Sequence, residues 1–156
     1  MECYTVMAAE IIHQIEHVPT HIYLQAGVGG LAGAMAACFR AAWGDAPMIT
    51  VVEPAFAPAL TNSIIEGKFV STSGPVSDMG RLDCKEASLI ALAGLSRDAN
   101  SFVTLTEKEC LDAIQVLPKY NLDTSSSGGA GIAAMTMSDL PSDARVLCIL
   151  SEGPDE

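Results

Sequence analysis

The stretch from Thr20 to Gly33 constrains the fold of this chain more than any other part of its sequence. It begins with His-Ile-Tyr-Leu-Gln at 21–25, a run that is long and apolar enough for a buried strand. Glycines at positions 27, 29 and 30 end that pattern, and the residues from Leu31 onward suit a helix. A helix that begins after such a turn presents unpaired N–H groups and a favourable dipole to an anion. We therefore expect a phosphate-binding turn here, the alternative being a tight turn that binds nothing.

Strand and helix patterns alternate along the rest of the chain. Further strands are expected over 48–52, 101–105 and 145–150, and further helices over 5–16, 58–66, 86–95 and 106–117. Thr5 and Thr106 are the expected N-caps of two of these helices. A second small-residue turn, Ser125–Gly131, is expected to lead into a helix that ends near Met137. This alternation predicts a single α/β domain over residues 1–156, with an open, mostly parallel, twisted sheet and helices on both faces in three layers.

Composition and charge exclude several classes of partner. The chain has 8 basic and 19 acidic residues, a formal charge of −11, which repels nucleic acid and anionic membrane surfaces. No apolar run approaches the length of a membrane span, and the first residues lack the basic region of a signal peptide. The five cysteines are scattered without a paired motif, which is typical of the reducing cytoplasm. Glu10, His13 and His17 could share a helical face, but such residues are common on acidic surface helices, and we predict no metal site.

Taken alone, the glycine segment satisfies a dinucleotide fingerprint. Residues 27–32 match GxGxxA, and Glu53 follows the next strand, where an acid would bind a ribose. Glu53 could equally be a solvated residue at the end of a strand. The fingerprint normally follows the first strand of its domain, whereas here a helix comes first, and it does not account for residues 125–131 or 151–153. An NAD-binding oxidoreductase domain therefore stays as the alternative.

Six sequence blocks, taken in order, resemble a different class. They are YTVMAAE at 4–10, QAGVGGLAG at 25–33, VVEP at 51–54, MGRLDC at 79–84, SGGAG at 127–131 and SEG at 151–153. Together they resemble the tryptophan-synthase-β-like, or fold type II, pyridoxal-phosphate enzymes, and within that class they are most similar to the diaminopropionate ammonia-lyases. The resemblance covers nearly all of this chain but only the C-terminal part of the family's chain.

The resemblance implies roles for nine residues in binding pyridoxal 5'-phosphate. They are Gly27, Val28, Gly29, Gly30, Leu31, Met79, Gly80, Ser127 and Ser151. The segment 27–31 would bind the phosphate through backbone N–H groups, Met79 and Gly80 would lie beside the ring, and Ser127 would shape the pocket. Ser151 would place a neutral hydroxyl against the pyridine nitrogen, which suits elimination from the substrate β-carbon. The structural alternatives are a helix cap for Ser127, a strand-end hydroxyl for Ser151 and ordinary packing for Met79.

The resemblance also implies a lysine that this chain lacks at the matching position. Lys68, Lys85, Lys108 and Lys119 lie in polar segments, whereas the family's Schiff-base lysine lies upstream of the matched region. We therefore assign no catalytic residue to this chain. The sequence predicts part of a cytoplasmic ammonia-lyase that converts 2,3-diaminopropionate, or a similar amino acid such as serine or threonine, to pyruvate and ammonia. A non-catalytic remnant is the alternative, and exposed apolar surface favours a homo-oligomer or association with an N-terminal portion.

Overall fold

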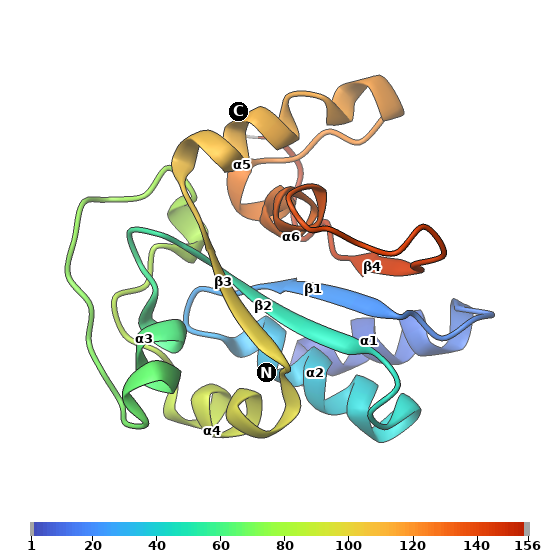
Figure 1. Ribbon diagram of the computed structural model, residues 1–156, viewed down its shortest axis with the longest axis horizontal. Coiled ribbons are helices and arrows are strands. Elements are labelled where there is room, and N and C mark those ends of the chain that lie inside the picture. Colours follow the sequence, from blue (N-terminus) through green and yellow to red (C-terminus); the bar gives the residue numbers. More distant parts are fainter. Residues whose placement is uncertain (1, 155–156) are drawn as a thin grey trace.

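The computed structural model describes residues 2–154, and a four-stranded sheet lies at its centre (Figure 1). The strands are β1 (His21–Gln25), β2 (Met48–Pro54), β3 (Ser101–Leu105) and β4 (Val146–Cys148). Their order is β3-β2-β1-β4, and each neighbouring pair is parallel. The open, parallel α/β sheet that the sequence predicts is therefore confirmed.

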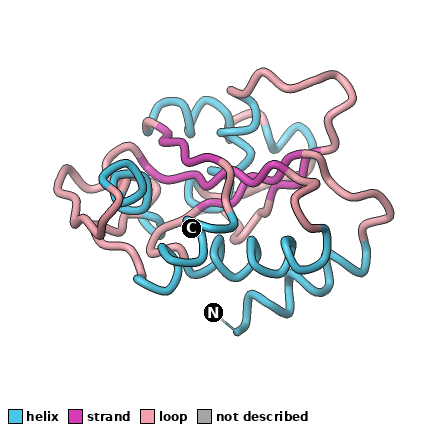
Figure 2. Tube along the Cα trace, turned by 60° about the horizontal axis from the view of Figure 1, so that its bottom comes forward, coloured by secondary structure: helices cyan, strands magenta, loops and turns pink. Residues whose placement is uncertain are grey.

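Helices cover both faces of this sheet. They are α1 (Glu2–Gln14), α2 (Gly30–Trp43), α3 (Ala59–Glu66), α4 (Leu89–Asp98), α5 (Glu107–Ile114) and α6 (Ser126–Thr136), with short 3₁₀ helices η1 (Gly80–Leu82) and η2 (Leu117–Tyr120). Figure 2 shows the strands between two helical layers, as the sequence predicts. The longest helix, α2, has 14 residues, and none within residues 2–154 is long and apolar enough to cross a membrane.

Alternate side chains of the strands build a separate apolar core on each face. Ile22 and Leu24 of β1 pack with the buried residues of α1 and α2, whereas Tyr23 packs with those of α5 and α6. β1 is buried at four of its five positions because it has a strand on each side and helices above and below. The helix pairs α1–α2 and α2–α4 close one face, and the pair α5–α6 closes the other.

The first helix differs from the prediction at both ends. Thr5 does not cap α1: its hydroxyl donates to the carbonyl oxygen of Glu2 at 2.6 Å, so Thr5 lies inside the first turn. The helix ends at Gln14, before His17. His13 and His17 therefore do not share a helical face, and no cluster of metal-ligating side chains occurs within residues 2–154.

The second small-residue segment is a helix and not a turn that precedes one. Ser125 is the N-cap of α6, and its hydroxyl accepts a hydrogen bond from the N–H of Gly128 at 3.0 Å. Gly128 and Gly129 lie within the helix because their neighbours leave no room for a side chain. A Cβ at position 129 would lie 2.7 Å from Cγ2 of Ile114 on α5. Gly129 thus serves the close packing of α6 against α5, whereas Gly131 serves its close packing against β1.

The topology determines where a ligand can bind. After β1 the chain crosses to β2 through α2, on one face of the sheet, whereas β4 is reached through α6, on the other face. The carboxyl ends of β1 and β4 are adjacent, since the two strands pair in parallel. In open α/β sheets, the usual ligand site is the crevice between two adjacent strands whose connecting helices lie on opposite faces of the sheet.

Candidate functional site

A cavity of about 560 Å³ lies at the carboxyl ends of β1 and β4. Its lining consists of Tyr4, Met7, Gln25, Ala26, Gly27, Val28, Gly29, Gly30, Leu31, Arg81, Leu82, Cys84, Ser88, Ser127, Ser151 and Glu152. Seven of the nine residues named from the sequence are among them; Met79 and Gly80 are not. The structure therefore brings together the segment 27–31, Ser127 and Ser151, which lie far apart in the sequence.

Residues 27–31, here called the glycine loop, form one wall of the cavity. Gly29 has φ 92°, and a Cβ there would lie 2.9 Å from Cβ of Ala91 and 3.1 Å from Cδ1 of Leu60. A Cβ at Gly27 would meet Sγ of Cys84 at 2.9 Å and the carbonyl oxygen of Arg81 at 3.0 Å. Both positions therefore require glycine, for the backbone angle at 29 and for space at both.

The backbone donors of the glycine loop are available to a ligand. Within residues 2–154 the N–H groups of Gly27, Gly29, Gly30 and Leu31 donate no hydrogen bond, and no side chain caps α2. The loop is instead held through its carbonyl groups, because Val28 accepts from the N–H of Ser88 at 2.9 Å and Gly29 from that of Gly33 at 2.8 Å. Free N–H groups at the N-terminus of a 14-residue helix favour an anion such as a phosphate.

Gln25, Ser127 and Ser151 are polar side chains in the rest of the lining. Ser127, in the first turn of α6, accepts a hydrogen bond at 3.1 Å from the N–H of Arg81, so it joins α6 to η1 and is not the helix cap. The amide nitrogen of Gln25 lies 3.1 Å from Oγ of Ser151, which is the one polar contact recorded for that hydroxyl within residues 2–154. Ser151 is therefore free to donate its proton to a ligand in the cavity.

Glu152 connects three segments at the edge of the cavity. Its carboxylate pairs with Arg81 of η1 and accepts a hydrogen bond from the Ser125 hydroxyl at 2.7 Å. Its backbone carbonyl accepts from the hydroxyl of Thr124 at 2.8 Å. Arg81 is largely exposed, so its ion pair adds little stability, but the contacts together hold the chain after β4 against the N-terminus of α6.

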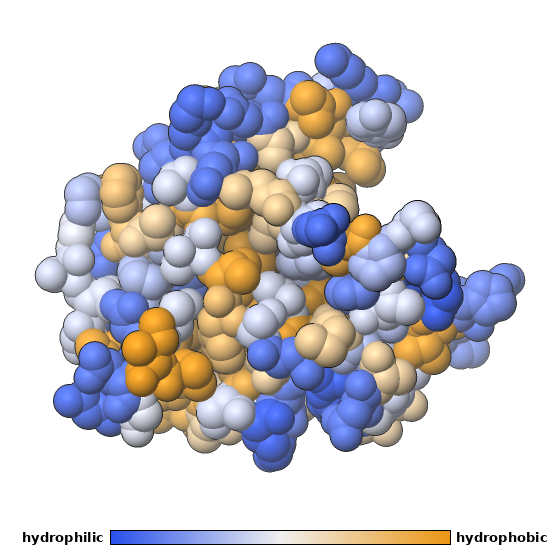
Figure 3. Space-filling model, in the orientation of Figure 1, coloured by the Kyte–Doolittle hydropathy of each residue, from blue (hydrophilic) through white to orange (hydrophobic). Residues whose placement is uncertain are grey.

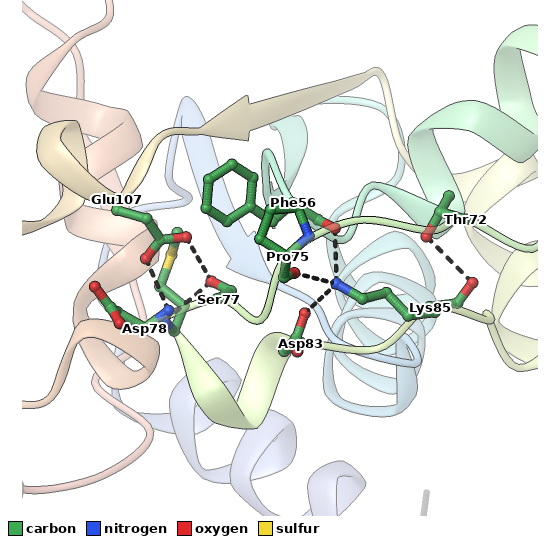
Figure 4. Close-up of polar contacts among 9 residues, drawn as sticks. Phe56, Thr72, Pro75, Ser77, Asp78, Asp83, Lys85 and Glu107 are labelled. Atoms are coloured by element: carbon green, nitrogen blue, oxygen red, sulfur yellow. Dashed lines mark hydrogen bonds and ion pairs between the residues drawn. The ribbon is translucent and has the colours of Figure 1, made fainter.

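The segment that carries η1 is anchored at both ends (Figure 4). At one end, Nζ of Lys85 donates to the carbonyl oxygens of Phe56 and Pro75, both at 2.8 Å, and to Oδ1 of Asp83 at 2.6 Å. At the other end, the carboxylate of Glu107 accepts from the Ser77 hydroxyl at 2.7 Å and from the N–H of Asp78 at 2.9 Å. These contacts hold Arg81, Leu82 and Cys84 at the cavity; burial raises the pKa of the Cys84 thiol.

Met79 and Gly80 lie in the same segment but outside the lining. Met79 is fully buried among Tyr23, Leu105 and the alanines of α6, which is the placement that ordinary packing would require. Its neighbours Arg81 and Leu82 reach the cavity in its place. None of the four lysines contributes to the lining either, and Lys85 is committed to the contacts just described.

Glu53 does not take the position that the dinucleotide interpretation requires. It is fully buried, and its carboxylate accepts hydrogen bonds from the N–H of Leu60 at 2.8 Å, the N–H of Thr61 at 2.7 Å and the Thr61 hydroxyl at 2.6 Å. Burial raises the pKa of Glu53, and these hydrogen bonds oppose that rise. Glu53 therefore caps the first turn of α3 and does not reach the cavity, so the ribose-binding role considered for it is wrong.

Sequence reasoning missed several residues of the lining. Gln25 could have been predicted as a lining residue, since a polar residue ends an otherwise apolar strand just before the glycine loop. Glu152 adjoins Ser151 and could have been included with it. Tyr4 and Met7 belong to the first of the six blocks, but their pattern assigned them no role, because only the packing of α1 against α2 brings them to the cavity.

A cavity at the carboxyl ends of a parallel sheet, bounded by a glycine loop and serine hydroxyls, is typical of an enzyme that holds a phosphorylated cofactor. A family model described as pyridoxal-phosphate dependent enzyme matches residues 1–152, and the chain belongs to this family. The resemblance seen in the sequence and the predicted cofactor are thereby confirmed.

Among curated proteins, the chain is similar to diaminopropionate ammonia-lyases. It is 27% identical to the protein from Escherichia coli strain K12 over 176 residues, and 29% identical to that from Salmonella typhimurium strain LT2 over 151 residues. The matches cover 98% and 86% of this chain, but only 44% and 37% of those relatives. The chain thus spans less than half the length of the curated relatives it matches.

Solved structures show the same fold. Diaminopropionate ammonia lyase from Escherichia coli, in complex with an aminoacrylate–PLP azomethine reaction intermediate, superposes with a TM-score of 0.87 at 25% identity, covering 96% of this chain and 44% of that one. The T.th. threonine deaminase has a TM-score of 0.86 at 19% identity, with 98% and 57% covered. The placement of this chain within the fold type II architecture is therefore confirmed.

The residues present fit a pyridoxal phosphate. At the start of α2, the N–H groups of the glycine loop that donate no hydrogen bond suit the phosphate. The Ser151 hydroxyl and the largely apolar surfaces of Leu31 and Leu82 suit a heteroaromatic ring.

Proposed function

We propose that this chain forms the phosphate-binding side of an ammonia-lyase that acts on 2,3-diaminopropionate or a similar amino acid. The products would be pyruvate and ammonia. The observation that carries the proposal is that one cavity is lined both by glycine-loop N–H groups that donate no hydrogen bond and by the Ser151 hydroxyl. The names of the curated relatives support the substrate class.

Each part of the cavity would have a separate task. The glycine loop would bind the cofactor phosphate, and Ser151 would donate a hydrogen bond to the pyridine nitrogen. When bound, the cofactor supplies an electron sink that stabilises negative charge at the substrate α-carbon. A neutral hydroxyl beside the ring nitrogen limits that stabilisation, which favours loss of the β-amino group. Ser127, tied to η1, would keep the α6 side of the cavity in position.

The group that attaches the cofactor covalently and moves the α-proton is not supplied by the lining residues of this chain. No lysine lies among the lining residues described, so we propose that a segment outside this chain provides it. That segment, or a second copy of the chain, would associate with it in the active assembly. The alternative of a remnant without ligand receives no support from the loop, which borders an open cavity of about 560 Å³ and is not collapsed.

The proposal is tested by titrating the chain with pyridoxal phosphate, with NADH as the rival ligand, and then reducing with borohydride and mapping peptides. We expect pyridoxal phosphate to bind reversibly and to be displaced by inorganic phosphate. We expect no one lysine to be labelled stoichiometrically after reduction. Stoichiometric labelling of one lysine would contradict the site assignment. Tight NADH binding with indifference to pyridoxal phosphate would overturn the proposal in favour of the oxidoreductase alternative.

A further inference from the structure

Gln25 is the most buried polar residue among the cavity's side chains, and it lies directly beside Ser151. It ends β1 and is 2% exposed. Its amide nitrogen lies 2.9 Å from the carbonyl oxygen of Ile149, 3.1 Å from that of Gly128 and 3.1 Å from Oγ of Ser151. One side chain thus connects β1, α6 and the chain after β4 at the point where the cavity begins.

The surroundings determine which way the Gln25 amide is turned. Two backbone carbonyl oxygens can only accept hydrogen bonds, so the amide atom that faces both of them is the nitrogen. The amide oxygen lies on the opposite side, toward Gly131, where a Cβ would approach it to 3.0 Å. That oxygen is buried and has no hydrogen-bond partner within residues 2–154. The orientation is therefore held by the two carbonyl groups and by the space that Gly131 leaves.

This orientation restricts what the Ser151 hydroxyl can do. An amide nitrogen carries two protons and cannot accept, so Ser151 shares those protons with the two backbone carbonyl oxygens and cannot give its own proton to Gln25. Within residues 2–154 no protein acceptor takes that proton. The Ser151 proton is left to point into the cavity, while one lone pair of its oxygen is engaged.

We propose that Gln25 is a positioning residue that makes Ser151 a hydrogen-bond donor toward the ring nitrogen of the cofactor. This inference rests on the proposed function, since it needs the pyridine ring beside Ser151. A ring nitrogen that is not protonated offers a lone pair and needs a donor. A serine turned the other way would present its own lone pair and repel the ring. Gln25 would thereby help to keep the ring in its neutral form.

The test compares three probes on the full chain: pyridoxal phosphate, its carbocyclic analogue with C–H in place of the ring nitrogen, and inorganic phosphate. Gln25→Met keeps the length of the side chain and removes its donor, and Ser151→Ala removes the hydroxyl. We expect each variant to bind pyridoxal phosphate about three- to tenfold more weakly, as for one lost hydrogen bond. We expect unchanged affinity for the carbocyclic analogue and for inorganic phosphate.

The double variant shows whether Gln25 acts through Ser151. We expect Gln25→Met to have no further effect in the Ser151→Ala background, and additive losses would overturn the proposal. Equal weakening of pyridoxal phosphate and the carbocyclic analogue by Gln25→Met would also overturn it, since Gln25 would then only support packing. If wild type binds neither pyridoxal phosphate nor inorganic phosphate, the proposed function itself fails, and the two failures are thus distinguished.

Gln25→Glu provides a second variant in case Gln25→Met does not fold. The new carboxyl group faces the same two carbonyl oxygens, so it is held protonated and donates its one proton to one of them. Its oxygen beside Ser151 then accepts the serine proton and turns a serine lone pair toward the ring nitrogen. We expect a loss of pyridoxal phosphate affinity at least as large as that of Ser151→Ala, with a shift in the pH dependence of the bound cofactor's absorbance. Wild-type affinity and an unshifted pH profile in this variant would overturn the proposal.

Discussion

Gly29 has φ 92° and lies against Ala91 and Leu60, so a methyl group at this position meets both a strained backbone angle and a steric clash. We expect Gly29→Ala to lower the free energy of unfolding by about 2–3 kcal/mol, the strain and the overpacking each contributing. Pyridoxal phosphate binding should weaken as well, because the loop N–H groups shift. Urea unfolding and a cofactor titration measure the two effects.

Gly67 provides the matched control for Gly29→Ala. It also has a positive φ, 63°, but a Cβ there would have no neighbour within 4 Å. Gly67→Ala should therefore cost only about 1 kcal/mol of backbone strain and leave cofactor affinity unchanged. Equal effects of the two variants on binding would mean that the glycine loop does not hold the phosphate.

Glu53 stabilises the start of α3 from a fully buried position. Glu53→Gln leaves one acceptor oxygen for three donors, so the N–H of either Leu60 or Thr61 loses its partner. We expect a loss of about 1–3 kcal/mol in the free energy of unfolding, measured by urea denaturation. Glu66→Gln, at the exposed far end of α3, is the control and should have almost no effect. NADH binding that disappeared in Glu53→Gln would contradict the capping role.

At the scale of the element, α5 begins with a reciprocal capping box. The Thr106 hydroxyl accepts from the N–H of Glu109, and the Glu109 carboxylate accepts from the N–H of Thr106 at 2.8 Å. The local pattern in the sequence was sufficient to predict this cap, because both partners lie within one helical turn. The same helix start holds the η1 segment through Glu107, so the capping of α5 also supports the wall of the cavity.

The capping box predicts a pH dependence of stability. Hydrogen bonds from the N–H and hydroxyl of Thr106 lower the pKa of Glu109 below its ordinary value of 4.5. A lowered pKa in the folded state adds stability that is complete above the ordinary value and is lost as the pH falls through the folded value. The difference in unfolding free energy between wild type and Glu109→Gln should therefore be full at pH 7 and shrink below about pH 4.5. Urea unfolding across this range measures it.

Glu10→Gln is the control for that pH series, since Glu10 is an exposed residue on α1. It removes an exposed carboxylate that takes part in no capping box, so a pH dependence that both variants share is not caused by the box. Thr106→Ala, which removes the hydroxyl of the box, should cost about 1 kcal/mol at neutral pH. A Glu109→Gln difference that did not change with pH would show that the carboxylate contributes through packing alone.

At the scale of the whole molecule, apolar surface remains uncovered beside α3 and α4. Ile65 of α3 is 75% exposed, and Leu89 and Ile90 of α4 are 66% and 72% exposed. On the face drawn in Figure 3, apolar side chains gather over α3, in the corner where Figure 1 places α3 above α4. Leu89 and Ile90 are neighbours on α4, and exposed apolar side chains of this size commonly mark an association surface.

We therefore expect the chain to associate with itself as its concentration rises, as the sequence analysis also predicts. Ile90→Lys should reduce the association measured by sedimentation equilibrium, because it replaces one of these exposed apolar side chains with a charged one. Val76→Lys is the matched control, since Val76 is 82% exposed but lies in the loop before η1, away from α4. A monomeric wild-type chain at all concentrations would contradict the prediction.

Much of the fold was accessible from local sequence signals. The bounds of β1 and β3 agree with the predicted ranges, because short apolar runs between glycine, proline or polar residues determine them. The errors have physical causes. Thr5 looked like a cap, but the helix begins before it. The glycines of α6 looked like a turn, although close contacts with α5, with β1 and with the chain after β4 explain them. Local propensity cannot reveal such packing, since it depends on residues distant in the sequence.

The sequence by itself determined that a strand, the glycine loop and a helix follow one another in residues 20–43. It also determined the three segments that supply the seven predicted lining residues. These features depend on neighbours along the chain and on ordered motifs. Only the tertiary structure decided that Glu53 caps α3, that Met79 packs beneath the cavity and that Gln25 directs the Ser151 hydroxyl. The Glu53 cap spans only seven and eight positions, but it depends on how the chain turns from β2 into α3. The contacts of Gln25 depend on which groups the parallel pairing of β1 and β4 and the packing of α6 bring within hydrogen-bond distance. Gln25 is 124 positions from Ile149 and 126 from Ser151 in the sequence, and these separations are beyond the reach of any local pattern.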